Sequence, residues 1–250
     1  MTPLAGIPSD EVDAILAAGR SGISRMFLSM SARHPGGDDA GYLAWHTLDH
    51  RPEQHRLPGL RASIRLVSTP ECRAVRAVSS PELDAIDHVM TYFFADESSL
   101  AGFGQLSVAL REAGRSPFIL PPIRRGVYAI GQICAAPYIR VGADVLPWWP
   151  AKGVYLIVGD APVPVDRLSA VAGVGGVWSA AAVDTAPEPG EAVSARQGHL
   201  AYCFLEDDPV TVARNIRPIL EQSCLETGRP VSFAAPFHLV VPHEWNRYLP

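Results

Sequence analysis

The chain has 250 residues, of which 48% are hydrophobic, and this composition allows a substantial buried core in one large domain or two small ones. Its 21 basic and 26 acidic residues give a formal net charge of -5 with no long run of either sign, so we expect no binding to nucleic acid or to a membrane surface. No segment reaches the roughly 18 uninterrupted apolar residues that a membrane-spanning helix needs.

Residues 1–21 are predicted to form an N-terminal helical extension. Ser9 is a good N-cap, Asp10 and Glu11 suit the positive end of a helix dipole, and apolar residues follow at helical spacing up to Gly19. Acidic residues this early argue against a signal peptide, and the four scattered cysteines form no CxxC pair. We therefore expect a cytoplasmic protein.

Residues 22–136 carry the pattern of one α+β unit. The predicted strands and helices follow in the order strand 22–31, helix 39–50, strand 60–67, strand 87–95, helix 98–113 and strand 126–135. The third element is the clearest, because its apolar residues alternate with Arg61, Ser63 and Arg65. Pro52 is expected to limit the first helix, since proline removes a backbone donor.

The second half repeats this order in degraded form. A Pro-rich junction is predicted at 137–152, and the second unit follows at 153–250. Its predicted elements are strand 152–159, which begins at the last junction residue, helix 165–172, strand 176–184, strand 199–205, a helix from 209 to about 224 and strand 231–241. Two βαββαβ units in tandem are the simplest interpretation.

One stretch of the first unit resembles a known family. A helix with an aromatic residue and then histidine precedes Pro-Glu, Leu-Pro-Gly and an arginine-bearing strand; the matching residues are Trp45, His50, Pro52, Glu53, Leu57, Pro58, Gly59, Leu60, Arg61 and Ala62. This pattern resembles the EthD-like proteins of the dimeric α/β-barrel superfamily. The resemblance implies an α+β fold in which two ferredoxin-like repeats pack their antiparallel sheets as an intramolecular barrel.

The resemblance also implies a range of activities. Members of the superfamily include cofactor-free monooxygenases, lactone isomerases, polyketide cyclases and, in distant branches, haem enzymes such as chlorite dismutase. The second half has no counterpart of residues 50–53, so we expect one competent site per chain.

Three histidines, His46, His50 and His55, fall within ten positions. His46 and His50 are four apart and share one helix face, where two imidazoles can exchange protons near neutral pH or bind a metal. The resemblance favours His50 as the general base, although histidines at a helix end also serve as caps. HxxxH supplies two metal ligands and Asp49 lies on the wrong face, so we expect no metal.

Further candidates come from the strands. His88 and Tyr92 are possible acid/base partners of the cluster, which completes a predicted catalytic set of His50, His46, Tyr92 and His88. The predicted substrate-binding residues are mostly aromatic and comprise Trp45, Phe94, Tyr128, His238 and Arg61. Arg61 and Arg65 share a strand face that can receive a carboxylate, but a solvated sheet edge is the simpler explanation.

These residues predict an enzyme without cofactor, of the isomerase, cyclase or lyase type and less readily a monooxygenase, acting on a small apolar, aromatic or polyketide-like substrate. One alternative is a non-catalytic small-molecule binding or accessory protein. Another is a haem enzyme with His199 or His238 as the iron ligand. An internal repeat completes the barrel within one chain, so a monomer or a homodimer is expected.

Overall fold

The computed structural model describes residues 5–183 and 198–249. Within them, eight antiparallel strands close into a barrel, because the last strand of the series pairs back to the first. The order around the barrel is β2 (Leu60–Val67), β4 (His88–Phe94), β1 (Arg25–Ser31), β5 (Pro122–Ala135), β7 (Val174–Val183), β8 (His199–Leu205), β6 (Gly153–Gly159) and β9 (Val231–Leu239). The predicted α+β class with an antiparallel barrel is confirmed.

Each half of the barrel has the same strand order. Numbered along the chain, the four strands of either half lie in the order second, third, first, fourth. The halves meet at two seams of unequal length. β5 and β7 pair from Val127 opposite Val183 to Ala135 opposite Gly176, with one irregularity between Ile130 and Ile133. β2 and β9 pair only at Leu66 with Leu239 and at Val67 with His238.

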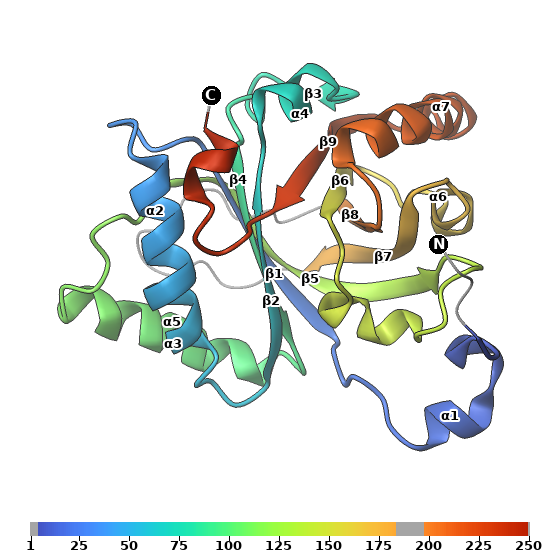
Figure 1. The fold of residues 1–250 in the computed structure, drawn as a ribbon, viewed down its shortest axis with the longest axis horizontal. Helices are drawn as coiled ribbons and strands as arrows, with labels where there is room; N and C mark the ends of the chain where they lie inside the picture. The colour runs from blue at the N-terminus through green and yellow to red at the C-terminus, as the bar shows by residue number, and fades with distance from the viewer. Residues whose placement is uncertain (1–4, 184–197, 250) are drawn as a thin grey trace.

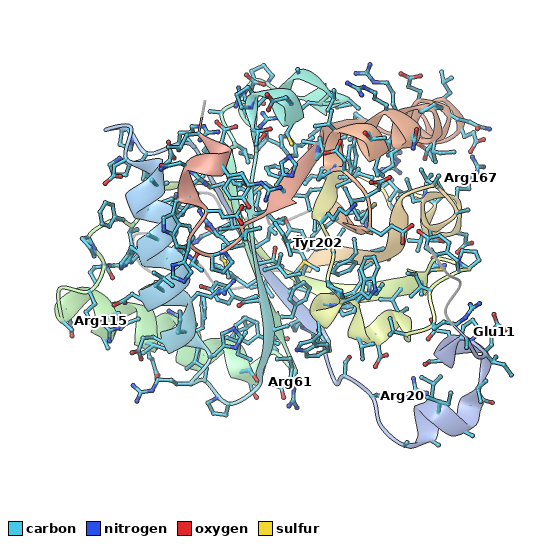
Figure 2. All side chains as sticks on the ribbon, in the orientation of Figure 1. Glu11, Arg20, Arg61, Arg115, Arg167 and Tyr202 are labelled. Atoms are coloured by element: carbon cyan, nitrogen blue, oxygen red, sulfur yellow. The ribbon has the colours of Figure 1, made fainter. Side chains whose placement is uncertain are left out.

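Alternation along the strands fills the inside of the barrel. Met26, Leu28 and Met30 of β1 belong to the central hydrophobic cluster, whereas the intervening residues face outward. The centre is aromatic: the Phe93 ring lies 5.6 Å from Trp178 and 5.9 Å from Tyr202, both edge-on. Figure 2 shows Tyr202 in the middle of the molecule. The barrel interior is therefore a packed core.

Helices cover the outside of each half (Figure 1). The first half carries α2 (Asp39–Trp45), η2 (His46–His50), α3 (Arg51–Gln54) and α5 (Ser98–Glu112), and the second carries α6 (Val165–Ser169) and α7 (Pro209–Thr227). The two layers pack differently. α5 buries only Leu110, whereas α7 buries Pro209, Val212, Ala213, Ile216, Leu220 and Ser223. The first layer leaves space above its strands.

Shorter elements complete the described chain: η1 (Ser9–Glu11), α1 (Asp13–Ala17), α4 (Pro70–Ala74), β3 (Val78–Ser79), η3 (Ala143–Trp148) and η4 (Trp245–Tyr248). β3 adds to the edge of β9. The single N-terminal helix predicted over 9–19 is wrong, because Val12 is extended (φ -131°, ψ 98°) and separates η1 from α1. None of the helices in residues 5–183 and 198–249 combines the length and the apolar character of a membrane span.

The helix predicted over 39–50 runs on to Gln54, so Pro52 does not limit it as predicted. The reason is the π-helical turn of η2, in which the N–H of Arg51 donates to the carbonyl of His46. In a regular α-helix the ring of Pro52 would clash with the preceding turn, and the wider turn relieves this conflict. The final strand of the second unit ends at Leu239 and β5 begins at Pro122, four residues earlier than expected. The predicted end of strand 176–184 lies outside the described residues.

Candidate functional site

A cavity of about 380 Å³ lies between the outer face of strands β2, β4, β1 and β5 and the helices that cover them. Its floor consists of two rows of residues in register. In one row, Arg65 of β2 is opposite Met90 of β4, Met90 is opposite Ser29 of β1, and Ser29 is opposite Arg125 of β5. In the next row, Tyr92 is opposite Phe27. The floor thus combines polar and apolar side chains.

His46 and His50 form the roof of this cavity and stand at the two ends of the π-helical turn. Their ring centroids are 5.2 Å apart. The Nδ1 atoms of both are buried and have no hydrogen-bond partner in the described structure. The Nε2 of His50 lies 3.4 Å from the side-chain nitrogen of Gln54, and Trp45 covers the His50 ring at 5.0 Å. The pair is held in place and has unused nitrogens.

Both imidazoles are uncharged at neutral pH. Burial lowers the pKa of His50 to about 4, and the charges of Arg65 and Arg115 act in the same direction, against Asp49. Burial lowers the pKa of His46 well below its ordinary value, and Arg65 and His50 add to this effect. A neutral imidazole can accept a proton from a bound molecule, so the pair is chemically able to act as a base.

Arg65 is the buried charged residue of the floor and is only 3% exposed. Its guanidinium lies 4.6 Å from the centroid of the Tyr42 ring, a cation–π contact. No carboxylate of the described residues forms an ion pair with it, and its Nε and Nη2 have no hydrogen-bond partner there. A buried arginine in this state is unusual.

Aromatic rings form the walls. Phe103 of α5 lies 5.0 Å from Phe27 and 4.9 Å from Tyr92, and Tyr42 and Trp45 close the opposite side. Tyr92 is 2% exposed, its hydroxyl has no hydrogen-bond partner among the described residues, and burial raises its pKa. The Tyr92 O–H is therefore a proton donor facing a mainly apolar space.

Four of the sequence-predicted residues meet in the cavity: His46, His50, Tyr92 and Trp45. His88 does not line it. Its Nε2 lies 2.6 Å from the Asp39 carboxylate, and its ring packs edge-on against Tyr42 at 4.9 Å. Burial lowers the pKa of His88 to about 4, although the Asp39 hydrogen bond opposes this shift. Asp39 is also close to Arg33, so a neutral His88 that donates one hydrogen bond suffices.

The remaining predicted substrate-binding residues lie elsewhere. Tyr128 faces the barrel interior, and Phe94 packs with Phe103 below the cavity. His238 is on the outer face of β9, 6.3 Å from the Tyr248 ring. Arg61 is exposed at the start of β2 (Figure 2). The geometry places these four outside the cavity lining.

Metal ligation finds no support in the described residues, where no group of three histidine, cysteine, aspartate or glutamate side chains could hold an ion. The acidic residues beside the histidines are already paired, since Arg115 binds Asp49 at 2.9 Å and Glu53 at 3.0 Å. These pairs fasten the helical roof to the chain after α5.

Sequence reasoning missed Arg65 as a cavity residue, together with Tyr42 and Ser29. The alternation of β2 placed Arg61 and Arg65 on one face, and a solvated edge explained both. That explanation fits Arg61 and is wrong for Arg65, because the helical roof covers only that end of β2. The signal for Tyr42 was its place one turn before His46 on the helix.

The equivalent space in the second half is filled. Side chains of α6 and α7 interdigitate there with the strands, among them Leu168, Val212 and Ile216. His199 and His238, the two residues considered as haem ligands, belong to strands of this half and do not line the cavity.

No family model and no curated protein matches the chain. Solved structures do. An anthrone oxidase-like protein is 9% identical, with 89% of this chain and 94% of that chain covered and a TM-score of 0.50. A protein provisionally assigned as a chlorite dismutase is 11% identical, with coverages of 91% and 99% and a TM-score of 0.51. A chlorite dismutase variant from Candidatus Nitrospira defluvii is 9% identical, covers 96% and 100%, and has a TM-score of 0.48.

The first two of these neighbours are dimeric α/β-barrel proteins. The chain therefore has the dimeric α/β-barrel fold, with the barrel closed within one polypeptide. At such low identity the likeness defines the fold alone.

Proposed function

We propose that the protein is an enzyme that moves a proton on a small aromatic or polyketide-like molecule, with His50 as the general base and no cofactor. The observation that carries this proposal is the pair of neutral imidazoles with unpartnered nitrogens over an aromatic cavity. His50 is preferred to His46 because it is the less buried of the two. The oxidase-like and dismutase-like neighbours are consistent with an enzyme but suggest no particular reaction.

The roles of the neighbouring residues follow from their positions. His50 would accept a proton from a carbon or hydroxyl of the substrate, and the Tyr92 hydroxyl would donate a hydrogen bond to the oxygen on which negative charge develops. Trp45 and Phe103 would hold a flat ring between them. Proton transfer of this kind serves an isomerase, a cyclase or a lyase.

The proposal extends to the organisation of the chain. The recurring strand order supports two ferredoxin-like repeats, of which the EthD-like first repeat carries the site and the second is degenerate. Because the barrel closes within one chain, a monomer would suffice, as would a homodimer of such barrels. We propose that the protein works in the cytoplasm.

A substrate screen with a matched variant tests this function. Wild-type protein and His50→Gln are incubated with a panel of small aromatic and polyketide-like compounds, and products are detected by mass spectrometry. We expect a product with wild type that His50→Gln forms at least about 100-fold more slowly, the usual contribution of a general base. Circular dichroism checks the fold, and His243→Asn, on the exposed C-terminal segment, serves as the control.

Three results would contradict the proposal. Equal turnover by His50→Gln would remove His50 as the base. Ligand binding without any product would favour an accessory protein. A Soret band in the purified protein, or its appearance on adding haemin, would favour a haem protein.

A further inference from the structure

Arg65 differs from two half-buried arginines of the described structure, Arg33 and Arg76. Arg33 contacts the carboxylates of Asp39 and Asp87, and Arg76 contacts Asp87 at 3.2 Å. Arg65 is more buried than either of them, and among the described residues its guanidinium has only the face of Tyr42 as a partner. A guanidinium removed from water without a counter-charge is costly, so the folded protein keeps this residue at a loss of stability.

No acidic side chain of the described residues lines the cavity. Arg65 lies in its floor and Arg111 at its exposed rim. Positive charge beside apolar walls attracts an anion more strongly than the same charge in bulk water, because the protein screens charge less than water does. The missing counter-charge is therefore expected from a ligand.

We propose that the cavity binds a small aromatic carboxylate whose carboxylate group pairs with the guanidinium of Arg65; this inference rests on the proposed function and names its substrate class. The planar guanidinium matches a carboxylate better than it matches a single oxygen. The rings of Phe27, Tyr92 and Phe103 supply flat apolar contacts beside it. A cavity of about 380 Å³ suits a molecule of one or two rings.

The same pairing would prepare the base. The positive charge of Arg65 is one cause of the lowered pKa of both His46 and His50, after burial. A carboxylate bound at Arg65 offsets that charge and raises the pKa of both imidazoles toward neutrality, where a base is most effective. An anionic substrate would thus increase the basicity of the histidine that accepts its proton.

Binding of sodium benzoate, compared with its neutral analogue benzamide and with phenol, tests the inference at constant ionic strength. Calorimetry on the wild-type protein should give a Kd for benzoate at least about tenfold lower than for benzamide, as expected for a charge-assisted contact. Arg65→Met should abolish this preference. Arg214→Met, which removes an exposed arginine on α7, should bind benzoate as wild type does.

Folding does not confuse the result, because Arg65→Met removes an unpaired buried charge and should melt no earlier than wild type. If it fails to fold, Arg65→Lys retains the charge without the fork and should still prefer benzoate to benzamide, with weaker affinity. Equal binding of benzoate and benzamide by wild type, no benzoate binding at all, or full benzoate affinity in Arg65→Met would overturn the inference. Preference for phenol would replace the carboxylate with a phenolate or enolate oxygen and overturn it too.

The two proposals fail separately. Benzoate binding that depends on Arg65, without turnover of any compound, would leave the anion site and remove the enzyme. Turnover of a neutral aromatic compound that depends on His50, without benzoate binding, would do the reverse.

Discussion

Acid should destabilise the folded protein through His50, and one substitution should remove the effect. Burial lowers the pKa of His50 from 6.5 to about 4, so the folded state stays unprotonated where the unfolded chain binds a proton. The stability is therefore full above the unfolded pKa of 6.5 and is lost as the pH falls toward the folded value of about 4. At about 1.4 kcal/mol per pKa unit, this amounts to about 2 kcal/mol between about pH 8 and about pH 5.

Urea unfolding at several pH values, followed by tryptophan fluorescence, measures this loss. Wild type should lose about 2 kcal/mol more than His50→Gln between about pH 8 and about pH 5. His46 and His88 are present in both proteins, so their own contributions cancel to first order. The control is His243→Asn, because asparagine tolerates the left-handed backbone at this exposed position (φ 70°), and it should follow wild type. Parallel curves for wild type and His50→Gln would refute the reasoning.

Two further predictions concern two glycines and the buried thiols. Gly114→Ala should cost about 1 kcal/mol in the free energy of unfolding, because its φ is 71° and nothing lies near an added Cβ. Gly59→Ala (φ 88°) should cost clearly more, because its Cβ would also overlap Ser99, and equal losses of the two variants in urea unfolding would contradict this. The thiols of Cys72 and Cys203 are buried, and burial raises their pKa. A thiol reagent at about pH 8 should therefore modify neither cysteine until urea unfolds the protein. Labelling of either cysteine in the native protein, detected by mass spectrometry, would contradict their burial.

The local sequence pattern predicted most of the barrel strands, because apolar and polar residues alternate along a strand that has one buried face. β2 was predicted over Leu60–Val67 with the bounds that the structure has, since one of its faces is apolar throughout. Period two shows which residues share a face, but not which face turns inward. Tyr92 and Tyr128 are both predicted as site residues for that reason, and the structure places Tyr92 in the cavity and Tyr128 in the barrel interior.

The candidate site was harder to predict because it depends on contacts between distant segments. Arg61 and Arg65 look equivalent along β2, and only the position of the helical roof buries one and exposes the other. The π-helical turn that presents His46 and His50 has no simple sequence signature, and Pro52 suggested an end to the helix there. The histidine cluster was visible in the sequence, but the burial of Arg65 beside it without a carboxylate partner was not.

The segment between β2 and β4, which contains α4 and β3, also affects the tendency of the barrel to aggregate. An unpaired strand edge is a template for aggregation. The short pairing with β2 would leave most of that edge of β9 open, but β3 covers it: Val78 is opposite Ala234, Ser79 is opposite Phe233, and Ser80 donates its N–H to Ser232. Two short segments thus share one edge, so the barrel can be held by a brief seam without offering β9 to a second molecule.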